Sequence, residues 1–370
     1  MKTLIACDSF KGSLSSPQVC ACISDALKGA GFDTTVCPLA DGGEGTVDAF
    51  STALECERVT TAVHDPLMRQ ITAQYIIADK TAVIEMAAAS GITLLKREEL
   101  NPEITSTYGT GELILHAIER GCTKIILGIG GSATNDGGKG CLEALGATFT
   151  DSDNRPLPHG GASLTRLDKI KLDNFKKVSD YAQLIIACDV TSPLCGENGA
   201  SQVFAPQKGA DEQQVEGLEK ALSHLSDKSR ELLGTDYALL PGTGAAGGLG
   251  FGLVAFCGGK LTTGFDALSS ALNLSEKIKA CDIVITGEGK TDRSTLLGKL
   301  PISVSALARK HNKPCYLISG DIDDSIDISD HFKGAYKCRQ PSDSVETAIE
   351  NAHSRLISAT ERLIKDIKVI

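Results

Sequence analysis

Five times along this chain, a short apolar run is followed directly by a polar turn that contains glycine. These turns occupy residues 8–13, 41–46, 128–140, 189–199 and 287–295. Apolar runs of this length are typical of buried strands, and helical patterns follow several of the turns. Strand, turn and helix repeated in this order fold into a parallel sheet covered by helices. The predicted fold class is therefore α/β.

The two ends of the chain share this alternation, whereas the middle differs. Residues 58–64, 70–78 and 81–87 have strand patterns joined by tight turns, which favours antiparallel hairpins. We therefore predict two domains. One is a discontinuous Rossmann-like domain with a parallel sheet, from residues 1–75 and 280–370, and the other is an inserted α+β domain from residues 76–279. The active site is predicted in the cleft between them.

The longest turn lies within LGIGGSATNDGGKG, residues 127–140, and has the composition of an anion-binding site. Glycine lets backbone N–H groups come close to a ligand, and successive N–H groups form a concavity that binds anions. We predict that Gly130, Gly131 and Ser132 hold a phosphate or a carboxylate. The alternative is an ordinary tight connection between a strand and a helix.

Carboxylates, hydroxyls and cations in the five turns suit phosphate chemistry. Mg²⁺ binds on one or two carboxylates plus substrate phosphates, and phosphoryl transfer to an alcohol uses a carboxylate for the hydroxyl proton. The predicted catalytic residues are Asp189, Asp8 and Lys11, the predicted metal ligands are Asp136, Glu288 and Asp292, and the predicted substrate or phosphate ligands are Ser9, Gly42, Gly43, Gly130, Gly131, Ser132, Lys139, Lys290 and Arg293. Taken singly, the same side chains suit helix caps and solvated loops equally well.

The sequence contains partial matches to two nucleotide-binding motifs, the dinucleotide fingerprint and the P-loop. Residues 128–133 and 242–247 fit the dinucleotide fingerprint, but turn residues follow the first, and Pro241 rather than a strand precedes the second. Gly289-Lys290-Thr291 ends like a P-loop, yet Val284 stands where that motif needs glycine. An NAD-dependent oxidoreductase and a non-catalytic nucleotide- or acid-binding regulator therefore stay as alternatives from other classes.

Composition narrows the partners to small molecules. The net charge is -10 and the chain has no Trp, so a nucleic-acid partner is not expected. The uncharged segment 238–259 contains Pro241 and eight glycines, which argues against a membrane span. Thirteen scattered cysteines without a C-x-x-C motif, and a start that resembles a strand rather than a signal peptide, predict free thiols in a cytoplasmic protein.

An ordered set of motifs resembles the bacterial glycerate kinase family of the type that forms 2-phosphoglycerate. The motifs are DSFKGSLSS (8–16), ADGGEGT (40–46), TSTYGTGELI (105–114), GIGGSATNDGGKG (128–140), ACDVTSPLCGENGAS (187–201), VFAPQKGA (203–210) and TGEGKTDRST (286–295). The resemblance implies ATP as co-substrate, Mg²⁺, D-glycerate as acceptor and a two-domain α/β fold without a P-loop. Formation of 3-phosphoglycerate, or another small hydroxy acid as acceptor, is the alternative within this class, and a homo-oligomer stays open.

Overall fold

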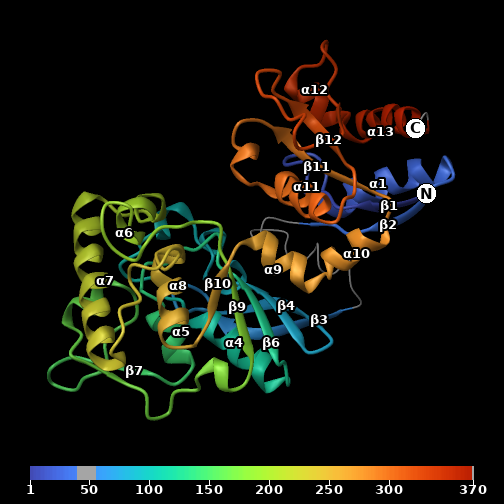
Figure 1. Ribbon diagram of the computed structural model, residues 1–370. Coiled ribbons are helices and arrows are strands. Elements are labelled where there is room, and N and C mark those ends of the chain that lie inside the picture. The colour runs from blue at the N-terminus through green and yellow to red at the C-terminus, as the bar shows by residue number, and fades with distance from the viewer. Residues whose placement is uncertain (40–55, 369–370) are drawn as a thin grey trace. The chain divides into compact units, whose positions relative to one another are not determined.

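The computed structural model describes residues 1–39 and 56–368 of the 370-residue chain. Contacts divide this part into two units (Figure 1). The first unit comprises residues 1–39 and 268–368, and the second comprises residues 56–267. Each unit has its own sheet and its own hydrophobic core.

The first unit contains a five-stranded sheet in which every pairing is parallel. The strand order is β13-β12-β11-β1-β2, so β1, near the start of the chain, pairs with β11, which lies about 280 residues later. The strands are β1 (Lys2–Ile5), β2 (Asp33–Val36), β11 (Ile283–Thr291), β12 (Cys315–Ile322) and β13 (Gly334–Lys337). This all-parallel sheet confirms the α/β fold class predicted from the strand–turn–helix repeats.

Helices cover both faces of this sheet. Consecutive residues of its strands are apolar, and their side chains point to opposite faces in turn, so both faces need cover. Ile5, Ile285 and Ile318 share one buried cluster with α1 and α13, whereas the intervening Leu4 and Val284 are buried outside that cluster. The helices of this unit are α1 (Ser16–Gly29), α10 (Leu274–Ala280), α11 (Leu300–Lys310), α12 (Val345–Glu350) and α13 (Ala352–Lys368), with a 3-10 turn at Thr295–Leu297. Helices α12 and α13 are separated at Asn351, the C-cap of α12.

The second unit is built on a six-stranded mixed sheet of order β10-β9-β6-β5-β4-β3. Pairing is antiparallel from β3 to β5 and parallel from β5 to β10, which confirms the predicted hairpins. Its strands are β3 (Glu57–His64), β4 (Gln70–Ala78), β5 (Thr81–Glu85), β6 (Lys124–Gly128), β9 (Gln183–Ala187) and β10 (Lys260–Thr262), and β7 (Thr148–Thr150) pairs separately with β8 (Lys169–Lys171).

The predicted domain boundaries differ from the units seen here. Strand β4 hydrogen-bonds to β3 on one side and to β5 on the other, so residues 56–75 belong to the second unit rather than the first. Residues 268–279 belong to the first unit, where α10 contacts β1. The predicted boundary after residue 75 therefore falls inside β4, because a sequence shows where strands occur but not which sheet they join.

The core of the second unit lies between its sheet and several helices, which supply buried residues such as Leu113, Leu142, Leu222 and Leu249. The helices are α3 (Ala87–Ser90), α4 (Tyr108–Glu119), α5 (Lys139–Ala144), α6 (Ala200–Phe204), α7 (Glu212–Leu233) and α8 (Ala245–Ala255), while α9 (Gly264–Ala271) leads into the first unit. Short 3-10 helices occupy Ile92–Leu94, Arg97–Glu99, Ala162–Arg166, Val178–Asp180 and Pro206–Lys208.

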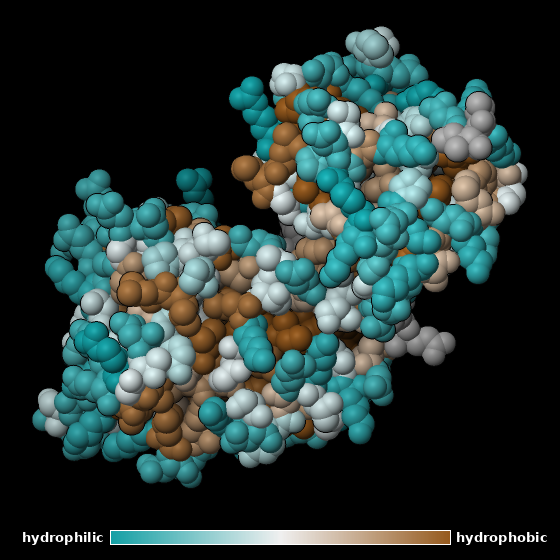
Figure 2. Space-filling view, viewed as in Figure 1, coloured by the Kyte–Doolittle hydropathy of each residue, from teal (hydrophilic) through white to brown (hydrophobic). Residues whose placement is uncertain are grey.

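Hydrophilic side chains predominate on the outer surface of each unit in the face shown in Figure 2, with hydrophobic side chains in patches between them. No helix of the described chain is both long and apolar enough to span a membrane. All thirteen cysteines are free thiols, as their scattered positions predicted, and most of them are buried.

Candidate active site

The carboxyl ends of four parallel strands surround a cavity of about 500 Å³ in the first unit. Asp8, Ser9 and Lys11 follow β1, Glu288 and Lys290 lie on β11, and Asp292 follows it. The ends of β12 and β13 add Asp321 and Arg339. Ligands of open α/β sheets bind at this end of the strands, and the volume is within the range of small-molecule sites.

Residues 287–291 were expected in a turn, but they continue strand β11. Glu288 pairs with Ser319 and Lys290 with Asp321 across the parallel ladder to β12. Glycine at 289 lets this strand pass close to the loop that follows β1. A Cβ at position 289 would lie only 3.1 Å from the backbone nitrogen of Lys11 in that loop. Gly289 thus has a packing reason, and because residues 287–291 form a strand, the segment is not a phosphate-binding loop of the P-loop kind.

Glu288 is the most enclosed acid of the cavity, with 7% of its surface exposed. The hydroxyls of Thr291 and Thr295 both donate to its Oε1, at 2.9 and 2.7 Å. Burial raises the pKa of Glu288, and these two hydrogen bonds oppose the shift only in part. A cation bound beside this carboxylate would remove the penalty that burial places on its charge.

Asp292 is held differently, by groups that favour its charged form. The hydroxyl and the backbone N–H of Ser294 donate to Oδ1 at 2.5 and 2.9 Å. These hydrogen bonds lower the pKa of Asp292 below its usual range. Lys290 Nζ lies 3.8 Å from Oδ2 of the same carboxylate. Asp292 is therefore an anion at neutral pH.

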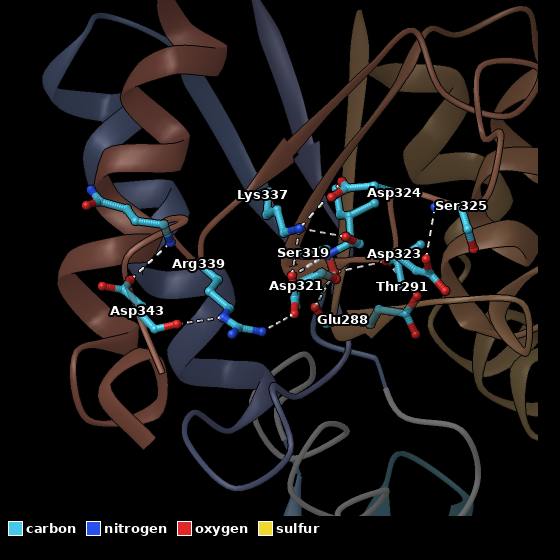
Figure 3. Close-up of polar contacts among 12 residues, drawn as sticks. Glu288, Thr291, Ser319, Asp321, Asp323, Asp324, Ser325, Lys337, Arg339 and Asp343 are labelled. Carbon is cyan, nitrogen blue, oxygen red and sulfur yellow. Dashed lines mark hydrogen bonds and ion pairs between the residues drawn. The ribbon is translucent and has the colours of Figure 1, made fainter. Parts of the chain in front are cut away.

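Arg339 connects the sheet to the loop that precedes α12 (Figure 3). Its guanidinium donates to Oδ2 of Asp321 at 2.8 Å and to the backbone oxygen of Asp343 at 3.1 Å. Asp321 also lies 3.0 Å from Lys337 Nζ. Partial burial opposes ionisation of Asp321, but its bonds to Lys337 and Arg339 prevail and lower its pKa. This network fixes the ends of β12 and β13 at the rim of the cavity.

The acids of the cavity fit a Mg²⁺ ion that is brought in with a phosphate ligand. Within residues 1–39 and 56–368, no three His, Cys, Asp or Glu side chains are arranged to hold a metal ion alone. Mg²⁺ needs only one or two carboxylates when substrate phosphates supply other oxygens. The buried Glu288 and the ionised Asp292 meet that requirement on adjacent parts of the cavity wall.

Part of this cavity was not predicted from the sequence. Lys299, Asp321 and Arg339 line it, yet none was a candidate. The signal for Asp321 was present, since Gly320-Asp321 comes after an apolar run in the sequence, as the five chosen turns do. Arg293, which was predicted, is exposed and is not among the side chains that line the cavity. Gly42 and Gly43 lie outside the described residues.

Asp136, a predicted metal ligand, lies in the second unit and is fully buried. Its oxygens accept hydrogen bonds from the backbone N–H groups of Thr107, Gly138 and Gly140, at 2.9 to 3.1 Å, and from the Thr107 hydroxyl. Burial raises the pKa of Asp136, and the bonds from Thr107 and Gly140 oppose this shift. These contacts favour a structural role, in which the carboxylate shapes the turn before α5.

Lys139 and Lys208 are buried lysines beside the same turn. Lys139 Nζ donates to the Pro158 oxygen at 2.9 Å and lies 2.8 Å from Glu143, so its charge is already compensated. Lys208 Nζ donates to the Thr134 oxygen at 2.7 Å. Burial lowers the pKa of Lys208 to about 7, with a smaller opposing effect of Asp136. The two lysines thus hold the glycine-rich turn and its surroundings through hydrogen bonds to backbone oxygens.

We expect Lys208 to make the stability of the protein depend on pH. Unfolded Lys208 titrates near 10.5, so between about pH 7 and 10.5 the unfolded chain binds more protons than the native chain. The free energy of unfolding should therefore rise with pH across this window. Urea denaturation of the wild type and of Lys208→Met should show a steeper rise in the wild type, and the exposed Lys220→Met should behave like the wild type. Equal slopes in all three proteins would contradict this expectation.

Only the start of the long turn is available to a ligand in the second unit. Gly130 and Gly131 are exposed, whereas Ser132 is 9% exposed and residues 133–140 are buried. The buried part packs closely against α8, because Gly137 N–H donates to the Gly247 oxygen at 2.9 Å. The predicted anion site at Gly130, Gly131 and Ser132 stays a prediction, now confined to one end of the turn.

Asp189 lies at the same edge of the second sheet as this exposed glycine pair. Strands β6 and β9 are parallel neighbours, with Gly128 opposite Ala187. The Asp189 carboxylate is exposed, and its Oδ1 accepts a 2.9 Å hydrogen bond from the N–H of Gly264, the first residue of α9. That contact is the one expected of a helix cap, so a catalytic role for Asp189 also stays a prediction.

Comparisons with known proteins agree with one another. The model of the glycerate kinase family matches residues 3–368. The chain is 44% identical to glycerate 2-kinase of Escherichia coli K12, over 89% of this chain and 87% of that protein. It is 42% identical to a glycerate kinase of Halalkalibacterium halodurans, over 86% and 85% of the two chains. A crystal structure described as glycerate kinase 2 of Salmonella typhimurium LT2 superimposes with a TM-score of 0.91 at 38% identity, covering 100% of this chain and 98% of that one.

Proposed function

Because the chain belongs to the glycerate kinase family and is an ATP-dependent kinase acting on an alcohol group of glycerate, we propose that it phosphorylates the 2-hydroxyl of D-glycerate with Mg²⁺ as the metal. The products are then 2-phosphoglycerate and ADP. The name of the Escherichia coli relative, glycerate 2-kinase, supports this regiochemistry. The thirteen free thiols suit a reducing compartment, and we place the reaction in the cytoplasm.

The observation that carries this proposal is the mixed charge of the cavity in the first unit. Lys11, Lys290 and Lys299 line it together with Glu288 and Asp292. The lysines suit the oxygens of a polyphosphate, and the two carboxylates suit the Mg²⁺ that accompanies it. Bound Mg²⁺ would neutralise charge on the transferring phosphoryl group.

In the proposed reaction, a bond forms between the 2-hydroxyl oxygen of glycerate and the γ-phosphorus of ATP. The bond from that phosphorus to the bridging oxygen breaks, and ADP leaves with the bond's electron pair. The hydroxyl proton goes to a carboxylate, and we assign this role to Asp8, at the end of β1. Lys11, three residues later on the same loop, supports the charge that develops on the phosphate oxygens.

The local structure speaks against the NAD-dependent alternative. A dinucleotide fingerprint needs a helix that begins inside it. After β6 the chain makes a turn, and α5 begins only at Lys139. At the second match, helix α8 contains left-handed residues at Ala246, Gly247 and Gly248, and no strand leads into it. The first segment therefore lacks a helix that begins within the fingerprint, and the second lacks the strand that should precede it.

A coupled assay tests the regiochemistry. Incubation with ATP, Mg²⁺, D-glycerate, enolase and pyruvate kinase should produce pyruvate without any phosphoglycerate mutase. Pyruvate that forms only after mutase is added would identify 3-phosphoglycerate as the product and contradict the proposal. Phosphorus NMR without coupling enzymes should show that chelation of Mg²⁺ stops turnover. If no hydroxy acid is phosphorylated at all, the chain is a non-catalytic regulator.

A further inference from the structure

One wall of the cavity in the first unit is apolar, although the strand ends around it are charged. Val345, Ala348 and Ile349 of α12 contribute to this wall, together with Ala352 at the start of α13. Val345 is 54% exposed and Ile349 is 42% exposed, so both present apolar surface to the cavity. They lie four residues apart and therefore on one side of the short helix.

The sheet holds this wall in place through charged side chains. Arg339, at the end of β13, donates to the backbone oxygen of Asp343, two residues before α12. The Asp343 carboxylate is buried and accepts from Arg355 of α13 at 2.7 Å and from the backbone N–H of Gln340 at 3.0 Å. Figure 3 shows how Asp321, Arg339 and Asp343 follow one another from the sheet toward this helix. The exposed apolar face is thus fixed relative to the charged strand ends.

We propose that the adenine base of ATP binds against Val345 and Ile349, and that the phosphates extend from there toward Lys290 and Lys299. This inference rests on the proposed function. Glycerate is small and wholly polar, so it has no part that would gain from apolar contact. ATP has a part to match each region of the cavity: a flat base of low polarity for the apolar wall, and a chain of anionic phosphates for the lysines. The division of the cavity into an apolar wall and a charged side, where lysines lie beside carboxylates, therefore matches a nucleotide that brings Mg²⁺ with its phosphates.

Binding of ADP and of inorganic pyrophosphate separates the two parts of this assignment. The double variant Val345→Ser/Ile349→Ser should raise the Kd for ADP by about tenfold, because apolar contact with the base is lost. The Kd for pyrophosphate should stay unchanged, since that ligand has no base. Lys290→Met should weaken both ligands. Isothermal titration calorimetry of the full chain gives each constant.

Leu297→Ser is the matched control, because Leu297 is 88% exposed in the same unit but does not line the cavity. It should bind both ligands like the wild type. Val345→Ala/Ile349→Ala is a milder double variant that favours helix formation and guards against loss of α12. Wild-type ADP affinity in the Ser and Ala double variants, or equal weakening of ADP and pyrophosphate, would overturn the assignment. Turnover of D-glycerate by the wild type tests the proposed function separately, so the two failures are distinguishable.

Discussion

Asp8→Asn is expected to lower kcat for D-glycerate phosphorylation by about a hundredfold or more, the usual effect of losing a positioned general base. Asn keeps the shape of the side chain, and its Oδ1 still accepts the 2.6 Å hydrogen bond from the Ser9 N–H. The melting temperature should therefore change little. Steady-state kinetics with saturating ATP and Mg²⁺ provide the measurement.

Two further Asp→Asn variants make this result specific. Asp25 is exposed on α1 and does not line the cavity, so Asp25→Asn should keep the wild-type kcat. Asp189→Asn distinguishes the two roles open to that residue. A lower melting temperature with normal kcat would make Asp189 the cap of α9, whereas a large loss of kcat with normal melting would make it catalytic. If Asp8→Asn retains more than about a third of the wild-type kcat, the proton goes elsewhere.

Asp136→Asn is expected to destabilise the second unit by about 3 kcal/mol. The substitution puts an amide donor where the carboxylate Oδ2 now accepts from the N–H groups of Thr107 and Gly140. Buried donors that face a donor lose their partners without gaining water. The thermal transition should move down by at least about 6 °C for a unit of this size.

The control for this variant is Asp153→Asn in the same unit. Asp153 is exposed, and its 3.1 Å ion pair with Arg155 lies on the surface, so its loss should cost less than about 1 kcal/mol. Differential scanning calorimetry compares the three proteins. A normal transition for Asp136→Asn, combined with a higher Mg²⁺ requirement for activity, would instead support the metal-binding role that the sequence suggested.

The sequence predicted the parts of the site that are contiguous in the chain. Asp8 and Lys11 follow an apolar strand in a turn, and Glu288 and Asp292 lie on or just after another, so their place at the strand ends follows from the α/β pattern. The pairing of β1 with β11 joins segments about 280 residues apart, and no local pattern in the sequence specifies which strands pair over such a distance. The sequence assigned both turns to one predicted active site, but it did not predict the direct pairing of β1 with β11 that brings them together.

Burial is what the sequence reading missed. Asp136 and Lys139 have the residue types of a metal and phosphate site, and only the packing of the turn against α8 shows that both are enclosed and already hydrogen-bonded. The apolar wall was missed for the opposite reason. Val345 and Ile349 look like ordinary core positions of a helix, and only their exposure at the cavity distinguishes them.

The pairing of β1 with β11 has a consequence for the order in which the protein folds during synthesis. Thr3 lies opposite Ile283, so the central pair of the first sheet forms only after the ribosome has made the whole second unit. Residues 56–267 are continuous and are able to fold as soon as they emerge. Until then the segment of β1, α1 and β2 lacks β11 and α13, which complete the cluster around apolar side chains such as Ile5 and Ile23. The N-terminal segment therefore exposes part of its apolar surface for as long as the synthesis of the second unit takes.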